Sequence, residues 1–175
     1  DYEEEQPQFK IPEDSNIQWH NATDYTSNEP VRKSPQYNLV YDGWNRNEMR
    51  TSQSLSGFVL GKGFGRDKGD KVNYEINILP GKEKGMIGFR YNTPKGKTST
   101  FQVKGITESR LELQGTGEYN IVSIPYTCKE PGKYTLELIS EGTHSTDLDG
   151  FFIGSEEDIK QIKILPRKLS IIPEI

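Results

Sequence analysis

The middle of the chain is a series of short segments in which hydrophobic and polar residues alternate. In DKVNYEINILP (70–80), Val72, Tyr74, Ile76 and Ile78 fall on one face of an extended strand, and polar residues fall on the other. This pattern predicts a half-buried antiparallel strand with one face toward water. Comparable segments follow at fairly even spacing, separated by glycine, proline or charged turns: MIGFRYN, STFQVKG, SRLELQG, EYNIVSIPY, GKYTLELIS and DGFFIG.

Shorter strands are predicted near both ends of the chain, at NIQWH, SGFVLGKG, IKILP and KLSIIP. The region 37–54 is rich in aromatic and amide residues and predicts a long irregular loop. At SEEDIKQI (155–162) one or two helical turns are expected, with Ser155 as the N-cap. About ten alternating strands without helical periods between them predict an all-β, antiparallel β-sandwich.

Composition favours strands as well. A single alanine, Ala22, stands against 17 glycines, nine tyrosines and 16 isoleucines, and alanine is the best helix former. Residues 1–16 are acidic, contain two prolines and have no sustained period, so they predict a linker or tail. Residues 17–175 are expected to form one β-sandwich domain.

Charge and motif patterns exclude several functions. The net charge is −4 with both signs scattered, so there is no basic stripe for nucleic acid. No apolar stretch approaches the roughly 18 residues of a membrane span. Ser, His and Asp occur in no recognisable nucleophile setting, so we expect no catalysis by this chain alone. An enzyme with an unfamiliar site stays an alternative.

The chain begins without methionine, which suggests a processed or excised product.

The order of the strands resembles that of known modules. In SGFVLGKGFGRDKGDKVNYEINILPGKEKGMIGFRYNTP (56–94), Gly-Asp opens the long strand and Arg-Tyr-Asn closes the next. With GKYTLELIS and TDLDGFFIG, this resembles carbohydrate-binding modules of families six and thirty-five, within the galactose-binding-like jelly rolls. The resemblance covers residues 17–154. It implies a jelly roll that binds a polysaccharide or oligosaccharide without cleaving it.

The resemblance also implies a setting for the domain. Such a module is an ancillary domain of a polysaccharide-degrading enzyme, covalently linked to a catalytic domain. The protein is then expected to be secreted, periplasmic or on the cell surface. The main alternative is a structural accessory β-sandwich that packs against a catalytic domain and binds no sugar.

Two aromatic residues are candidates for sugar stacking, which needs a flat ring beside a few polar groups. Trp44 lies in the polar loop YDGWNRNE and is expected to face the ligand; packing beneath the loop is the alternative. By resemblance, Tyr119 is the second stacking aromatic and Asp147 hydrogen-bonds sugar hydroxyls. Their alternatives are an ordinary sheet residue and a loop carboxylate that caps backbone N–H groups.

Arg90 and Asn92 flank Tyr91 at the end of a strand. Asn92 precedes Thr-Pro and is expected to face a loop, where its amide would bind sugar. The Arg90 guanidinium would pair with the carboxylate of a uronic acid, or would be a solvated strand residue.

Asp149 is the candidate metal ligand. The resemblance makes it the late acid of a structural calcium site, whose other two acids are glutamates of the first strand. Gln18 and His20 stand in that strand here. Calcium takes six to eight oxygens, so Asp149 supplies only part of a site. The alternative for Asp149 is a structural role in the loop that opens the last strand.

Overall fold

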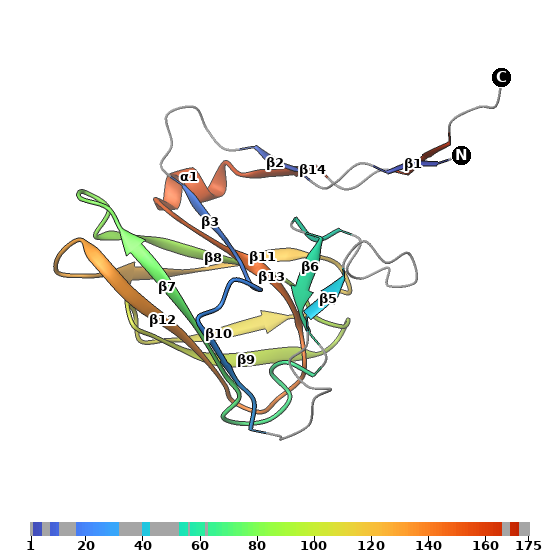
Figure 1. The fold of residues 1–175 in the computed structure, drawn as a ribbon, viewed down its shortest axis with the longest axis horizontal. Coiled ribbons are helices and arrows are strands. Elements are labelled where there is room, and N and C mark those ends of the chain that lie inside the picture. The colour runs from blue at the N-terminus through green and yellow to red at the C-terminus, as the bar shows by residue number, and fades with distance from the viewer. Residues whose placement is uncertain are drawn as a thin grey trace.

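The computed structural model describes residues 2–4, 8–10, 17–31, 40–42, 53–55, 57–61, 63–165 and 169–171. In these residues the chain forms two antiparallel β-sheets that pack face to face, with one short helix at the side (Figure 1). The predicted all-β sandwich is therefore confirmed. No helix in the described part of the chain is long and apolar enough to cross a membrane.

One sheet has five strands in the order β10-β9-β12-β7-β4. Their bounds are Ser109–Gln114 (β10), Thr98–Lys104 (β9), Gly132–Ser140 (β12), Lys71–Ile78 (β7) and Ser27–Glu29 (β4). The other sheet has the order β11-β8-β13-β6-β5, and β3 also pairs with β13. Its strands are Asn120–Thr127 (β11), Lys84–Asn92 (β8), Asp147–Gly154 (β13), Phe58–Leu60 (β6), Val40–Asp42 (β5) and Gln18–Asn21 (β3).

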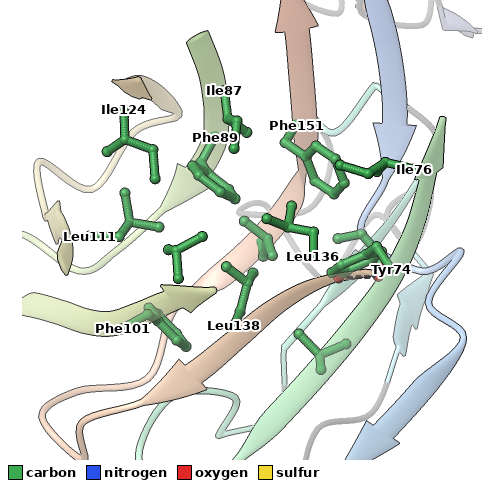
Figure 2. Close-up of a cluster of buried hydrophobic side chains, with 14 of the residues drawn as sticks. Tyr74, Ile76, Ile87, Phe89, Phe101, Leu111, Ile124, Leu136, Leu138 and Phe151 are labelled. Carbon is green, nitrogen blue, oxygen red and sulfur yellow. Dashed lines mark hydrogen bonds between the residues drawn. The ribbon is translucent and has the colours of Figure 1, made fainter. Parts of the chain in front are cut away.

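The main core lies between the two sheets (Figure 2). The four apolar residues of β7 that alternate in the sequence, Val72, Tyr74, Ile76 and Ile78, are all buried, as predicted. Phe151 of β13 lies at the centre, with its ring centroid 5.1 Å from that of Tyr74. The Tyr74 hydroxyl donates a hydrogen bond of 2.7 Å to the Ala22 carbonyl oxygen, so this polar group is satisfied inside the core.

A second apolar cluster covers the outer face of the six-stranded sheet. It is formed by Leu55, by Phe152 of β13, and by Ile159, which belongs to the helix α1 (Glu156–Lys160). The Ser155 side chain caps α1 by accepting from Asp158 N, as predicted. Because of this cluster β13 is buried on both faces. Trp19 of β3 is half-buried and lies against Phe152 with a centroid distance of 4.6 Å.

The polar face of β7 differs from its prediction at one position. Glu75 and Asn77 are exposed, but Asn73 is only 8% exposed. The strand β4 pairs beside Asn73, and the Asn73 amide donates hydrogen bonds to Ser27 Oγ (2.6 Å) and Glu29 Oε2 (3.0 Å). Neighbouring side chains, rather than the sheet interior, bury this residue.

Short strands at the two ends of the chain pair with each other. β1 (Tyr2–Glu4) pairs with β15 (Leu169–Ile171), and β2 (Gln8–Lys10) pairs with β14 (Lys163–Leu165), so the two ends run side by side (Figure 1). The two predicted C-terminal strands are confirmed. The division into a 1–16 tail and a 17–175 domain stays a prediction.

Replacement of the central core ring tests this packing. We expect Phe151→Ala to lower the free energy of unfolding by about 3–5 kcal/mol, because it leaves a cavity between the sheets. Phe58 is 41% exposed, so Phe58→Ala is a matched control with a smaller loss. Urea denaturation followed by circular dichroism measures both. Equal losses for the two variants would contradict the central position of Phe151.

Candidate functional site

One end of the six-stranded sheet gathers most of the residues selected from the sequence. Phe89 and Tyr91 of β8 point into the core. Because successive side chains of a strand alternate, those of Arg90 and Asn92 project from the opposite, outer face of the sheet. Asp147 of β13 lies directly opposite Asn92 in the β8–β13 pair. The structure therefore brings Arg90, Asn92 and Asp147 together on adjacent strands.

A hollow with a volume of about 190 Å³ lies at this end; we call it the loop hollow. It is formed by the connections 93–97, 115–119 and 141–146 and by the strand ends beside them. Its volume is below the roughly 300–1,000 Å³ of pockets that hold drug-sized ligands, so it has room for only part of a larger ligand. Its lining residues are Asn92, Pro94, Gly117, Ser145, Thr146 and Asp147.

Backbone hydrogen bonds fix two of these connections to each other. Gly117 N donates to Thr93 O (3.1 Å), and Gly115 N donates to Lys97 O (2.7 Å). A Cβ atom on Gly115 would lie only 1.9 Å from Pro94 O, so this close approach requires glycine. The hollow is therefore preformed by the backbone of the two loops.

The third connection, residues 141–146, is held in place by hydrogen bonds of Thr146. Thr146 Oγ1 lies 2.7 Å from Thr93 Oγ1 and donates to Asn92 O at 3.2 Å. Thr146 N donates to Phe64 O. Sequence reasoning missed Ser145 and Thr146, although both directly precede Asp147 in the segment STDLD.

Behind the hollow, Arg90 and Asp149 form a buried ion pair. Arg90 Nη1 lies 2.6 Å from Asp149 Oδ2, and the side chains are 5% and 0% exposed. Arg90 Nη1 also donates to Gln53 O (2.9 Å), and Leu55 N donates to both Asp149 carboxylate oxygens (3.1 and 3.0 Å). The expectation of a solvated Arg90 is therefore wrong, because residues 53–55 cover the pair.

Tyr119 lies on the other side of the Arg90 guanidinium. The Arg90 Cζ atom is 4.3 Å from the centroid of the Tyr119 ring, which is cation–π geometry. Tyr119 as a whole is half-buried, and it follows Gly117 of the hollow lining by two residues. Trp44, the other predicted stacking residue, lies outside the described residues.

A β-bulge explains the two aspartates that open β13. The register with β8 shifts between Leu148 and Gly150, at Asp149. Leu148 and Phe151 both point into the core although three positions separate them. Gly150 is needed because a Cβ atom there would lie 2.2 Å from His20 O of β3. Asp147 thus lines the loop hollow, and Asp149 lies in the ion pair.

The surroundings of Asp149 do not fit calcium. Both of its oxygens accept hydrogen bonds from N–H donors, and the positive charge of Arg90 would lie beside the metal. In β3, Gln18 and His20 hydrogen-bond to each other at 3.2 Å and supply no carboxylate. Among the described residues no group of three or more His, Cys, Asp or Glu side chains could hold a metal ion.

Burial changes the acidity of Asp149. Loss of hydration raises the pKa of its carboxyl from 3.8 to about 6, and the opposing effects of Arg90 and the Leu55 N–H only partly offset this. On the core side of β8 the Tyr91 hydroxyl donates to Gln114 O (2.7 Å), and burial raises the pKa of this hydroxyl.

Comparisons with known proteins identify the fold. No protein-family model and no curated protein sequence match the chain. A family 6 carbohydrate-binding module matches with a TM-score of 0.53 and 18% identity, over 79% of this chain and 92% of that one. The CBM36-1 domain of a multidomain xylanase from the hindgut metagenome of Trinervitermes trinervoides gives 0.54 and 16%, over 80% and 98%.

A third similar structure is the C-terminal CBM6 of LamC, a marine laminarinase from Zobellia galactanivorans. It matches with a TM-score of 0.53 and 18% identity, over 80% of this chain and 100% of that one. At these identities the likeness establishes the fold. The chain is a jelly roll of the kind found in family 6 carbohydrate-binding modules, as the resemblance in the sequence implied.

The acidity of Asp149 gives a pH-dependent stability. Because its pKa is higher in the folded chain than in the unfolded one, folding takes up a proton between these two values. This carboxyl therefore adds free energy of unfolding as the pH falls through about 6, and the gain is complete below the unfolded pKa. We expect a carboxyl titration by NMR with a midpoint near 6 that is lost in Asp149→Asn.

The Asn variant is also the control for stability. Acidification to below the unfolded pKa should raise the free energy of unfolding of the native chain relative to that of Asp149→Asn, by about 3 kcal/mol for a pKa that rises from 3.8 to about 6. An Asp149 midpoint below that of an exposed aspartate would show that the ion pair, and not burial, dominates.

Proposed function

We propose that this chain binds carbohydrate at the loop hollow and does not cleave it. The observation that carries the proposal is that Asn92 and Asp147, opposite each other on β8 and β13, both line one hollow, and that Tyr119 follows Gly117 of the same lining by two residues. An aromatic ring and a few fixed polar groups are the elements of a sugar site. The jelly-roll fold shared with carbohydrate-binding modules supports this assignment.

The chemistry of the site favours a neutral sugar. The Asp147 carboxylate accepts hydrogen bonds from two vicinal hydroxyls, and Asn92 both donates and accepts. A uronic acid would place its own carboxylate beside Asp147. Arg90 is engaged with Asp149, so it is assigned to hold the Tyr119 ring in place and not to bind an acidic ligand.

Cleavage of a glycosidic bond is not proposed. It normally requires two carboxyl groups on either side of the scissile bond, roughly 5–10 Å apart. In the described lining of the hollow Asp147 is the carboxylate, and Asp149 is committed to the buried pair. The site has the parts of a binding surface only.

We also assign the chain an accessory role in an exported polysaccharide-degrading enzyme. Two of the similar structures are described as domains of larger enzymes, a xylanase and a laminarinase. The rival role, a scaffold that packs on a catalytic domain, would favour an apolar patch. In the described residues the exposed large hydrophobic side chains are Val31, Phe58 and Leu79, which come from separate elements.

Affinity electrophoresis tests the proposed site. Gels would contain xylan, laminarin, dextran or polygalacturonate, and a neutral polymer is expected to retard the protein. Removal of the amide in Asn92→Ala, or of the charge in Asp147→Asn, should weaken binding about tenfold, the loss of one or two hydrogen bonds to sugar. Calorimetry is expected to give dissociation constants from micromolar to millimolar for the native chain.

Asn77→Ala provides a matched control, because Asn77 is exposed on β7 in the other sheet. Its mobility should equal that of the native chain. Trp44→Ala and Tyr119→Ala test the two proposed stacking residues in the same gels. Uniform mobility of the native chain in every polymer would contradict the proposal of carbohydrate binding and favour the scaffold role.

Metal removal gives a further result in these gels. Both Asp149 oxygens accept from N–H donors and the Arg90 charge lies beside them, so we expect the retardation to be unchanged when EDTA is added. Added calcium should likewise leave the melting temperature of the protein unchanged. Loss of retardation in EDTA, restored by calcium, would place a metal in the sugar site.

A further inference from the structure

A larger groove runs along the open side of the sandwich, between the edge strands β10 and β11. Its volume is about 520 Å³, within the roughly 300–1,000 Å³ of small-molecule sites. We call it the edge groove. Its floor is apolar, made by Tyr91, Val122 and Ile124 where the core reaches the gap between the sheets (Figure 2 shows Ile124).

The edge groove begins where the loop hollow ends. Thr116 lines the groove, and the next residue, Gly117, lines the hollow. Gln114 and Asn120, on either side of this connection, also line the groove. The Asn120 amide donates to Thr116 Oγ1 at 2.6 Å, which fixes the loop between the two depressions. A ligand that crosses this loop passes from one depression into the other.

Charge along the groove is balanced. Arg110 lines it with Glu112, and the two side chains are paired. Arg110 Nε also lies 2.9 Å from Glu141 Oε1, so the guanidinium is engaged by two carboxylates. An acidic ligand would find no free cation among these three groups. Hydroxyl groups suit a rim of paired charges and amides, and sugar C–H faces suit the apolar floor.

The groove has the length for several sugar units. From Arg110 to Gln114 the strand advances four residues, or about 13 Å at the usual rise per strand residue. This span holds more than one pyranose ring. The loop hollow alone is too small for such a ligand.

We propose that the edge groove binds the continuation of the same neutral glycan chain whose first unit enters the loop hollow. This inference rests on the proposed function and specifies its ligand as an extended oligosaccharide. An extended peptide is the other occupant that an open strand edge suggests. Pro125 removes a backbone donor from β11, and the Gln114 carbonyl already accepts from the Tyr91 hydroxyl. Both features oppose strand addition here.

Chain-length dependence of affinity tests the edge groove. Calorimetry would use xylo-, laminari- and isomalto-oligosaccharides from disaccharide to hexasaccharide. For the series that binds, the native chain should gain about tenfold in affinity from the shortest to the longest member. Gln114→Trp places a large ring on the exposed rim of the groove and should remove this gain while the disaccharide affinity stays unchanged.

Asn77→Trp is the matched control, the same replacement at an exposed position of β7, three strands from β10 in the five-stranded sheet. It should keep the full length dependence. Gln114→Ala removes only the amide and should give a smaller loss for the hexasaccharide, which keeps the test valid if the tryptophan variant fails to fold.

The outcomes separate the two assignments. Unchanged length dependence in both Gln114 variants, with weakened binding in Asn92→Ala, would overturn the edge groove and leave the loop hollow intact. Loss of binding in the Gln114 variants but not in Asn92→Ala would place a ligand in the groove alone, contradict the hollow and overturn the proposed continuation between them. No binding of any series by the native chain would overturn both.

Discussion

The candidate site depends on the buried ion pair between Arg90 and Asp149. The pair joins β8 to β13 at the bulge and fixes residues 53–55 across them through Gln53 O and Leu55 N. A buried pair adds little net stability, because desolvation offsets much of the attraction. Removal of one partner, however, leaves an uncompensated charge and costs about 3–5 kcal/mol. The pair therefore specifies one arrangement of the strands, and the Tyr119 ring rests on its guanidinium.

Two apolar clusters cover both faces of the six-stranded sheet but not the loop end of the sandwich, where the proposed site lies. The main core fills the space between the sheets, and the cluster under α1 covers the outer face of the six-stranded sheet. At the loop end the connections satisfy one another through backbone bonds, such as Gly117 N to Thr93 O. A site fixed in this way loses little conformational entropy when a ligand binds. A shallow polar surface can thus hold a flexible, hydroxyl-rich ligand with modest affinity.

The ion pairs beside the two depressions follow one pattern. The arginines nearest to them, Arg90 and Arg110, are each engaged by carboxylates of the chain itself. Asp147 supplies acceptors at the loop hollow, and amides and hydroxyls line the connection to the edge groove. Selectivity would then come from the arrangement of hydroxyl groups along a neutral chain rather than from its charge.

The sequence by itself determined the strands and the inner faces of the sandwich. Alternation of period two is a local property, so it identified Val72, Tyr74, Ile76 and Ile78 as core residues. The capping pattern of SEEDIKQI is also local and identified Ser155 as a helix cap. Resemblance of strand order selected Asp147 and Tyr119, and its place before Thr-Pro at the end of a strand selected Asn92. Only the tertiary structure decided what these residues contact. The bulge at Asp149, the cover of residues 53–55 over Arg90, and the joining of Thr93 to Thr146 all connect segments far apart in the chain. Such contacts leave no periodic signal, because each depends on how separate strands pack and not on the spacing of residues within one strand.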